Sequence, residues 1–155
     1  MSRMLNKLLP HPFLYLITHR LQFSPLPQLA WEKQIALLAE AAQAGCQLIQ
    51  IREKDLSARE LARFVAEAKA VTQPFGTKVL VNDRLDVALA TGADGIHLRT
   101  TSLPVYEVRR RAPSSFLLGV STHSLQEAQA AEQEGADFIV CGPVFYTPAK
   151  AEYGK

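Results

Sequence analysis

Short apolar runs alternate along the chain with longer segments in which apolar residues recur every three or four positions. That spacing lines one face of a helix, so the longer segments predict helices, the first of them over residues 27–44. The short runs are rich in β-branched residues and predict strands. Alternation of strand and helix is typical of a parallel α/β fold. Six strands are expected, at residues 12–18, 46–52, 78–82, 95–99, 116–121 and 138–144.

Capping residues mark the points where several of these helices begin. Ser57 is followed three positions later by Glu60, and Ser124 by Glu127, which is the spacing of a capping box. Pro104 opens a further helix, because proline is well tolerated in the first helical turn. These signals place helix starts shortly after predicted strands, as a repeated strand-helix unit requires.

Three segments, at residues 42–50, 90–98 and 132–140, resemble one another. Each ends a helix at a glycine and begins a strand about two residues later, so the same unit recurs along the chain. No GxGxxG motif follows the first strand, which disfavours a dinucleotide-binding sheet. We therefore predict an α/β fold of the (β/α)8 class, the TIM barrel.

The length of the chain sets a limit on this barrel. TIM barrels usually need roughly 200 residues or more, whereas this chain has 155 residues. We expect one domain over residues 1–155 that lacks the C-terminal quarter of a barrel and stops after its sixth strand. A fragment, a truncated gene and completion by a second chain, as in a homo-oligomer, are the explanations left open.

Composition and charge exclude several classes of partner. The net charge is +2 and Lys and Arg form no run of five, so no nucleic-acid partner is expected. No apolar run approaches the roughly 18 residues of a membrane span, and the first residues lack a signal-peptide pattern. No membrane partner and a cytoplasmic location are therefore expected. Cys46 and Cys141 lie in apolar runs and form no CxxC pair, which predicts two buried free thiols.

Polar residues alternate with apolar ones where the second predicted strand ends. Gln50, Arg52 and Lys54 recur at a period of two, which places them on one face. In a parallel barrel, charges at the carboxyl end of a strand lie at the mouth where the loops gather. Amide, guanidinium and ammonium donors suit a phosphate or diphosphate there. The alternative is an exposed edge strand with solvated charges.

The third and fifth predicted strands also end in polar residues. Asn82 suits a phosphate oxygen and Asp83 offers a hard oxygen to Mg²⁺, although Asn-Asp pairs are also common in turns. At the end of the fifth strand, Ser121 is a further donor and His123 is either an acid/base or a capping residue. His97 lies inside the fourth strand, where we expect a hydrogen-bonded structural histidine.

The loop after the sixth strand carries Thr147 and Lys150. Lys150 is either another cation brought over the site or a solvated loop residue. Taken together, donors on three strand ends and one carboxylate indicate a site for a small phosphorylated ligand.

Six segments carry a resemblance to a known family. The order and spacing of these segments resemble those of the thiamine phosphate synthases and their paralogues, the thiazole tautomerases. The segments are LYLIT (14–18), QIREKD (50–55), VNDRLDVAL (81–89), GADGIHL (92–98), GVSTHSLQEA (119–128) and GADFIVCGPVF (135–145).

The resemblance implies a TIM-barrel transferase of thiamine biosynthesis. In this family an aminopyrimidine methyl diphosphate loses diphosphate, and the nitrogen of a thiazole phosphate captures the resulting cation. Mg²⁺ and basic donors stabilise the departing charge. The resemblance implies that Asp83 binds Mg²⁺, that Thr147 approaches the thiazole phosphate, and that His123 and Lys150 are catalytic. It implies that the pyrimidine diphosphate is bound by Gln50, Arg52, Lys54, Asn82, Ser121 and Lys150.

Several positions depart from the synthase pattern. Where the synthases read HLGQED this chain reads HLRTTS, so Arg99 replaces a glycine and Ser102 replaces the second aspartate that binds Mg²⁺. A hydroxyl is a poorer Mg²⁺ ligand than a carboxylate, so weakened metal binding is expected. Ala149 and His19 stand where the family has threonine and aspartate. Two alternatives to a synthase follow: a thiazole tautomerase that uses His123 for proton transfer, and a non-catalytic binder of thiamine phosphates.

Overall fold

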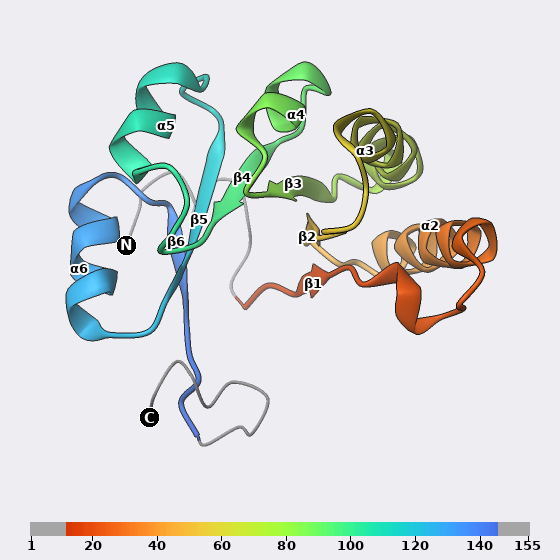
Figure 1. Cartoon of the computed structure of the whole chain (residues 1–155), viewed down its shortest axis with the longest axis horizontal. Helices are drawn as coiled ribbons and strands as arrows, with labels where there is room; N and C mark the ends of the chain where they lie inside the picture. Colours follow the sequence, from red (N-terminus) through yellow and green to blue (C-terminus); the bar gives the residue numbers. More distant parts are fainter. Residues whose placement is uncertain (1–11, 146–155) are drawn as a thin grey trace.

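The six predicted strands form one parallel sheet in a computed structural model that describes residues 12–145. Each strand pairs with its neighbours in sequence, in the order β1 to β6. The sheet curls, with helices on its outer side (Figure 1), so the predicted α/β barrel fold is confirmed over these strands. The strands are β1 (Tyr15–Ile17), β2 (Leu48–Ile51), β3 (Lys78–Asn82), β4 (Gly95–Leu98), β5 (Leu117–Thr122) and β6 (Phe138–Cys141).

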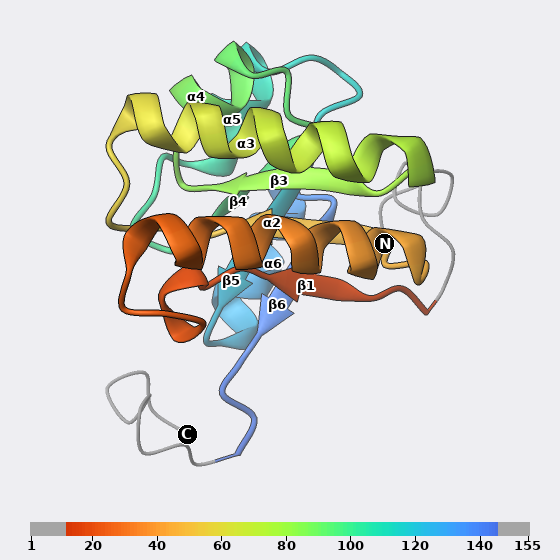
Figure 2. The ribbon, with the colours of Figure 1, turned by 90° about the vertical axis from the view of Figure 1, so that its right-hand side faces the viewer.

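Helices connect successive strands, and α2 and α3 lie side by side over the first strands of the sheet (Figure 2). Helical spacing in the sequence located all of them except α4, whose six residues are too few to show a period. None of the described helices is long and apolar enough to cross a membrane. The helices are α2 (Pro27–Gln43), α3 (Ala58–Thr72), α4 (Leu85–Ala90), α5 (Val105–Arg111) and α6 (Leu125–Gln133), with the 3-10 helices η1 (Arg20–Gln22) and η2 (Gln73–Phe75).

The two predicted capping boxes differ in the structure. At α3 the box is complete, because the Ser57 hydroxyl accepts from the Glu60 N–H at 3.3 Å and the Ser57 N–H donates to the Glu60 carboxylate at 2.9 Å. At α6 the Ser124 hydroxyl accepts from the Glu127 N–H at 3.2 Å. The Glu127 carboxylate accepts from the backbone N–H of His123 instead, at 2.6 Å, so this helix start also anchors the end of β5.

Alternating residues along the strands face two different cores. The larger core lies between the sheet and the helices and is built around fully buried residues such as Ile49, Phe64 and Leu118. The smaller core lies on the concave side, where Leu48, Leu80 and Leu117 pack with aromatic residues from β1 and β6. The period of two therefore determines which strand residues face the inside of the barrel.

The edge strand β6 differs from the expectation of buried thiols. Cys46 is buried, as predicted, but Cys141 is exposed. The reason is that β6 is an edge of the described sheet, where Ile139 and Val140 are 41% and 39% exposed. The prediction of burial was therefore wrong for Cys141, because an apolar run in the sequence does not reveal which strand lies at an edge.

We expect Phe64→Ala to lower the free energy of unfolding by about 3–5 kcal/mol, because it removes a fully buried ring and leaves a cavity. Phe64 packs edge-on against Trp31, with 4.8 Å between the ring centroids. Phe75→Ala is the matched control, since Phe75 is 51% exposed, and should cost less than about 1 kcal/mol. Urea unfolding of both variants measures the difference, and equal losses would contradict this account of the core.

Candidate functional site

Polar side chains replace the apolar ones on the concave face toward the carboxyl ends of the strands. Tyr15, His97 and Ser121 form a chain here: the Tyr15 hydroxyl lies 2.9 Å from His97 Nδ1, and His97 Nε2 lies 2.9 Å from the Ser121 hydroxyl. Burial, and then the nearby positive charge of Arg52, lower the pKa of His97 to about 4. Burial also raises the pKa of Tyr15. All three side chains are therefore uncharged at neutral pH.

A second polar pair lies beside this network. The Gln50 side-chain N–H donates to the Asn82 side-chain oxygen at 2.9 Å, across the ends of β2 and β3. Gln50 is buried, and Asn82 is half-buried. The structure thus brings two of the predicted ligand-binding residues into contact, and Asn82 also lines a cleft at the strand ends.

Arg52 and Lys54 lie beyond the end of β2. Because the strand ends at Ile51, the period of two that relates them to Gln50 does not extend to Lys54, which lies in the following turn. The backbone N–H of Arg52 donates to the Thr18 hydroxyl at 2.9 Å, while the charge of its side chain acts on His97. Arg52 therefore acts near His97, whereas Lys54 lies near Asn82 and Asp83.

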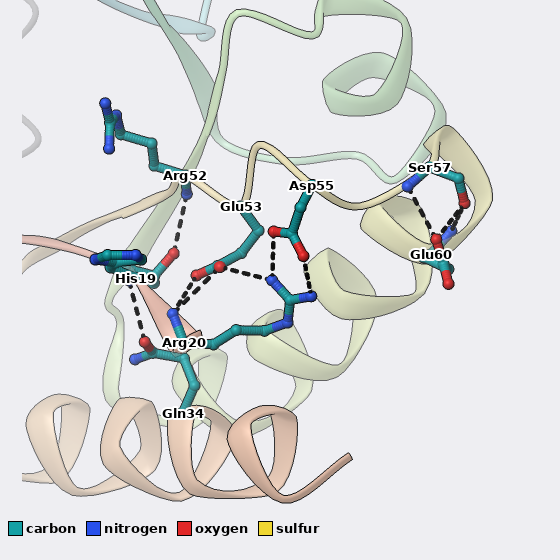
Figure 3. Close-up of polar contacts among 9 residues, drawn as sticks. His19, Arg20, Gln34, Arg52, Glu53, Asp55, Ser57 and Glu60 are labelled. Carbon is teal, nitrogen blue, oxygen red and sulfur yellow. Dashed lines mark hydrogen bonds and ion pairs between the residues drawn. The ribbon is translucent and has the colours of Figure 1, made fainter. Parts of the chain in front are cut away.

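A buried ion cluster holds this loop in place (Figure 3). The Arg20 guanidinium is bidentate to Asp55, with N–O distances of 2.7 and 2.6 Å, and also donates to Glu53 at 3.1 Å. The backbone N–H of Arg20 donates to the same Glu53 carboxylate. Arg20 and Glu53 are 3% and 5% exposed, so the charges compensate each other out of water. The hydrogen bonds from Arg20 lower the pKa of Asp55.

Asp83 follows β3 in a left-handed backbone conformation, with φ of 62°. Aspartate is among the few residues that tolerate this region. Its backbone N–H donates to the carbonyl of His97 at 2.9 Å, which directs the side chain toward the end of β4. There Arg99 donates to one carboxylate oxygen and the Ser102 hydroxyl donates to the other. Burial opposes ionisation, but these hydrogen bonds outweigh it and the pKa of Asp83 is lowered.

One cleft of about 260 Å³ lies at the carboxyl ends of β2, β3 and β4 and is bordered by Asn82, Asp83 and Arg99. Lys54, Arg84 and Arg99 bring three cationic side chains to it, beside Asn82 and Asp83. Arg84 is paired with Asp86 at 2.6 Å on the exposed side. Glu53 and Asp83 are the carboxylates of the lining, so the three cations outnumber them by one and an anion suits the cleft better than a cation does.

The donors present do not fit a Mg²⁺ ion at Asp83. Mg²⁺ binds carboxylate and other hard oxygens in octahedral geometry. Both oxygens of Asp83 accept hydrogen bonds from Arg99 and Ser102, and the guanidinium adds a positive charge where the ion would sit. Among residues 12–145, no three Asp, Glu, His or Cys side chains gather as a metal site would require.

The remaining predicted site residues lie apart from this cleft or outside the described chain. His123 lies after β5, where its Nδ1 contacts the carbonyl oxygen of Gly142 beyond β6. It therefore lies at the same rim as Ser121, near the end of β6. Thr147 and Lys150 fall outside residues 12–145, so their positions are not described.

Sequence reasoning missed several residues that shape the site. The sequence identifies Tyr15 only as part of a strand, and Arg99 only as a departure from a family pattern. The alternation in β1 places Tyr15 on the concave face, so counting inward positions would have found it. The ion cluster of Arg20 with Glu53 and Asp55 had no sequence signal, because its members are 33 and 35 residues apart.

The family model for thiamine monophosphate synthase matches residues 14–155. A thiamine-phosphate synthase of Methanoculleus marisnigri is 44% identical over 114 residues, covering 74% of this chain and 54% of that protein. One of Gloeobacter violaceus is 41% identical over 137 residues, covering 88% of this chain and 37% of that protein. The solved thiamine phosphate pyrophosphorylase of Pyrococcus furiosus superposes with a TM-score of 0.75 at 33% identity, covering 87% and 62%. The chain thus spans less than two thirds of each.

We expect Arg20→Met to lower the free energy of unfolding by about 3–5 kcal/mol, because it leaves the buried Glu53 carboxylate without a compensating charge. Arg84→Met is the matched control. Its ion pair with Asp86 is solvated, with the side chains 40% and 65% exposed, so the loss should stay below about 1 kcal/mol. Chemical denaturation measures both, and a small effect at Arg20 would show that the cluster contributes little to stability.

The low pKa of His97 predicts a pH-dependent stability. The unfolded chain takes up this proton near pH 6.5, whereas the folded chain takes it up only near pH 4. The free energy of unfolding should therefore fall as the pH is lowered through this interval, by on the order of 3 kcal/mol at about 1.4 kcal/mol per pKa unit. His97→Gln should flatten the profile, and His19→Gln, at an exposed histidine, is the control. An unchanged slope in His97→Gln would refute this.

Proposed function

This chain belongs to the thiamine monophosphate synthase family, and on that premise we propose that it joins the two halves of thiamine phosphate. The proposed substrates are an aminopyrimidine methyl diphosphate and a thiazole phosphate, and the products are thiamine phosphate and diphosphate. The observation that carries the proposal is the cleft at the ends of β2, β3 and β4, where Lys54, Arg84 and Arg99 line the same space as Asn82.

The cationic cleft suits the first step of this transfer. When the bond between the pyrimidine methylene carbon and the diphosphate oxygen breaks, the electron pair leaves with the diphosphate. Lys54 and Arg99 hold positive charge in place for that developing negative charge, and such preorganised stabilisation needs no rearrangement during the reaction. The Asn82 amide adds a neutral donor beside them.

The concave network suits the other product of bond cleavage, the pyrimidine-methyl cation. Tyr15, His97 and Ser121 offer hydrogen-bonding groups on the inside of the barrel. Because burial keeps the pKa of His97 at about 4, the imidazole adds no positive charge near the cation at neutral pH. The thiazole nitrogen then forms the new C–N bond. In this proposal Gln50 and Ser121 hold the pyrimidine, and Thr147 and Lys150 contact the phosphates.

A thiazole tautomerase is the second candidate function. The observation that favours it is the pairing of Asp83 with Arg99 and Ser102, which leaves the position without the donors of a metal site. Isomerisation of a thiazole needs proton transfer, and His123 at the rim of β5 is the histidine suited to that role. A non-catalytic binder would show neither activity.

The test is an assay with pyrimidine diphosphate and thiazole phosphate that follows thiamine phosphate and released diphosphate. We expect turnover by the parent, and a KM for the pyrimidine diphosphate at least about tenfold higher in Lys54→Ala, which removes a cation from the cleft, the loss expected for one charged hydrogen bond. Arg63→Ala, on the exposed side of α3, is the control. Isomerisation of the thiazole without condensation would support the tautomerase, and diphosphate binding with no turnover would support the binder.

A further inference from the structure

The turn after β4 is built so that two side chains reach Asp83 together. The Ser102 N–H donates to the carbonyl of Arg99 at 3.0 Å, and the Arg99 N–H donates to the Ser102 hydroxyl at 2.8 Å. This closed turn brings the guanidinium and the hydroxyl to the same side. Because these two hydrogen bonds hold the turn, the two side chains approach Asp83 together.

The two strand ends meet through complementary groups. Asp83 adopts its left-handed conformation, and its N–H is bonded to the carbonyl of His97 in β4. A strained backbone of this kind persists where surrounding contacts hold it. With its carboxylate aimed at the β4 turn, Asp83 receives one donor on each oxygen, from Arg99 and from Ser102.

The Arg99 guanidinium has the charge and position of a bound cation. It pairs with Asp83 at the lip of the cleft, and its side chain is 48% exposed. A guanidinium carries five N–H donors, and the described structure uses one of them on Asp83. The others are available to an anion in the cleft, which Arg99 lines with Lys54 and Asn82.

A divalent cation at Asp83 would have to displace this guanidinium. It would then find one carboxylate and the Ser102 hydroxyl, with Arg84 and Arg99 nearby as like charges. Repulsion from two arginines and a poor ligand set both disfavour the ion. Guanidinium groups also match phosphate oxygens with parallel donors, which a metal ion would otherwise coordinate.

We propose that the guanidinium of Arg99 takes the place of a divalent cation at Asp83, so that this chain binds the diphosphate group of its ligand without Mg²⁺. Asp83 then positions Arg99, and Ser102 satisfies the second carboxylate oxygen. The identity of the ligand rests on the proposed function, whereas the absence of a metal requirement rests on this pairing alone.

Titration calorimetry with inorganic diphosphate, in excess EDTA and in Mg²⁺, tests the proposal on the whole chain. The parent should bind diphosphate in EDTA, and Arg99→Gln should bind at least about tenfold more weakly there, the loss expected for charged hydrogen bonds. Arg110→Gln is the control, because it removes the same charge from a side chain 72% exposed on α5. Its affinity should match that of the parent.

Mn²⁺ alone, followed by electron paramagnetic resonance, gives a second readout. The double variant R99G/S102D, which removes the guanidinium and adds a carboxylate, should bind Mn²⁺ at least about tenfold more tightly than the parent.

The outcomes separate this inference from the proposed function. Diphosphate binding by the parent only when Mg²⁺ is present, or equal Mn²⁺ affinity in the parent and R99G/S102D, would overturn the role of Arg99 and leave the function intact. A parent that binds no diphosphate under either condition would overturn both.

Discussion

The site depends on a buried ion cluster that joins the end of β1 to the end of β2. Arg20 is almost fully buried, and its charge is compensated by Glu53 and Asp55 in the loop that carries Arg52 and Lys54. The backbone N–H and the guanidinium of Arg20 thus hold the loop that follows β2. A buried charge that lost its partner would be costly, so the loop has few alternative conformations. These ionic contacts therefore position the loop that carries Arg52 and Lys54 to the mouth of the barrel.

The concave face separates neutral from charged chemistry. Its lower part is apolar, where Leu48, Leu80 and Leu117 pack together, and above it the polar groups of Tyr15, His97 and Ser121 are uncharged. The charged groups stand further out, around the cleft at the strand ends. In the proposed transfer, the uncharged hydrogen-bonding groups would contact the pyrimidine ring. The positive charges further out would contact the departing diphosphate.

Asp83 shows how two residues at a neighbouring strand end change what a carboxylate can do. A free carboxylate at a strand end suggests a metal ligand, and its sequence neighbours Asn82 and Arg84 do not alter that interpretation. Its partners Arg99 and Ser102 are 16 and 19 residues away in the chain, on the next strand end. These partners engage both oxygens of the carboxylate and hold the Arg99 guanidinium beside it, so the charge of the cleft depends on a pairing between strands.

The sequence by itself determined the strand-helix order, the starts of α3 and α6, and which residues stand at the strand ends, because these follow from local spacing and capping. It also placed Gln50, Asn82 and Ser121 at one rim, since the carboxyl ends of parallel strands lie at the same edge of a sheet. Only the tertiary structure decided that Cys141 is exposed at an edge, that Lys54 leaves the strand, and that Arg20 is buried among carboxylates. These outcomes depend on contacts between residues far apart in the chain, where charge compensation and burial act across strands.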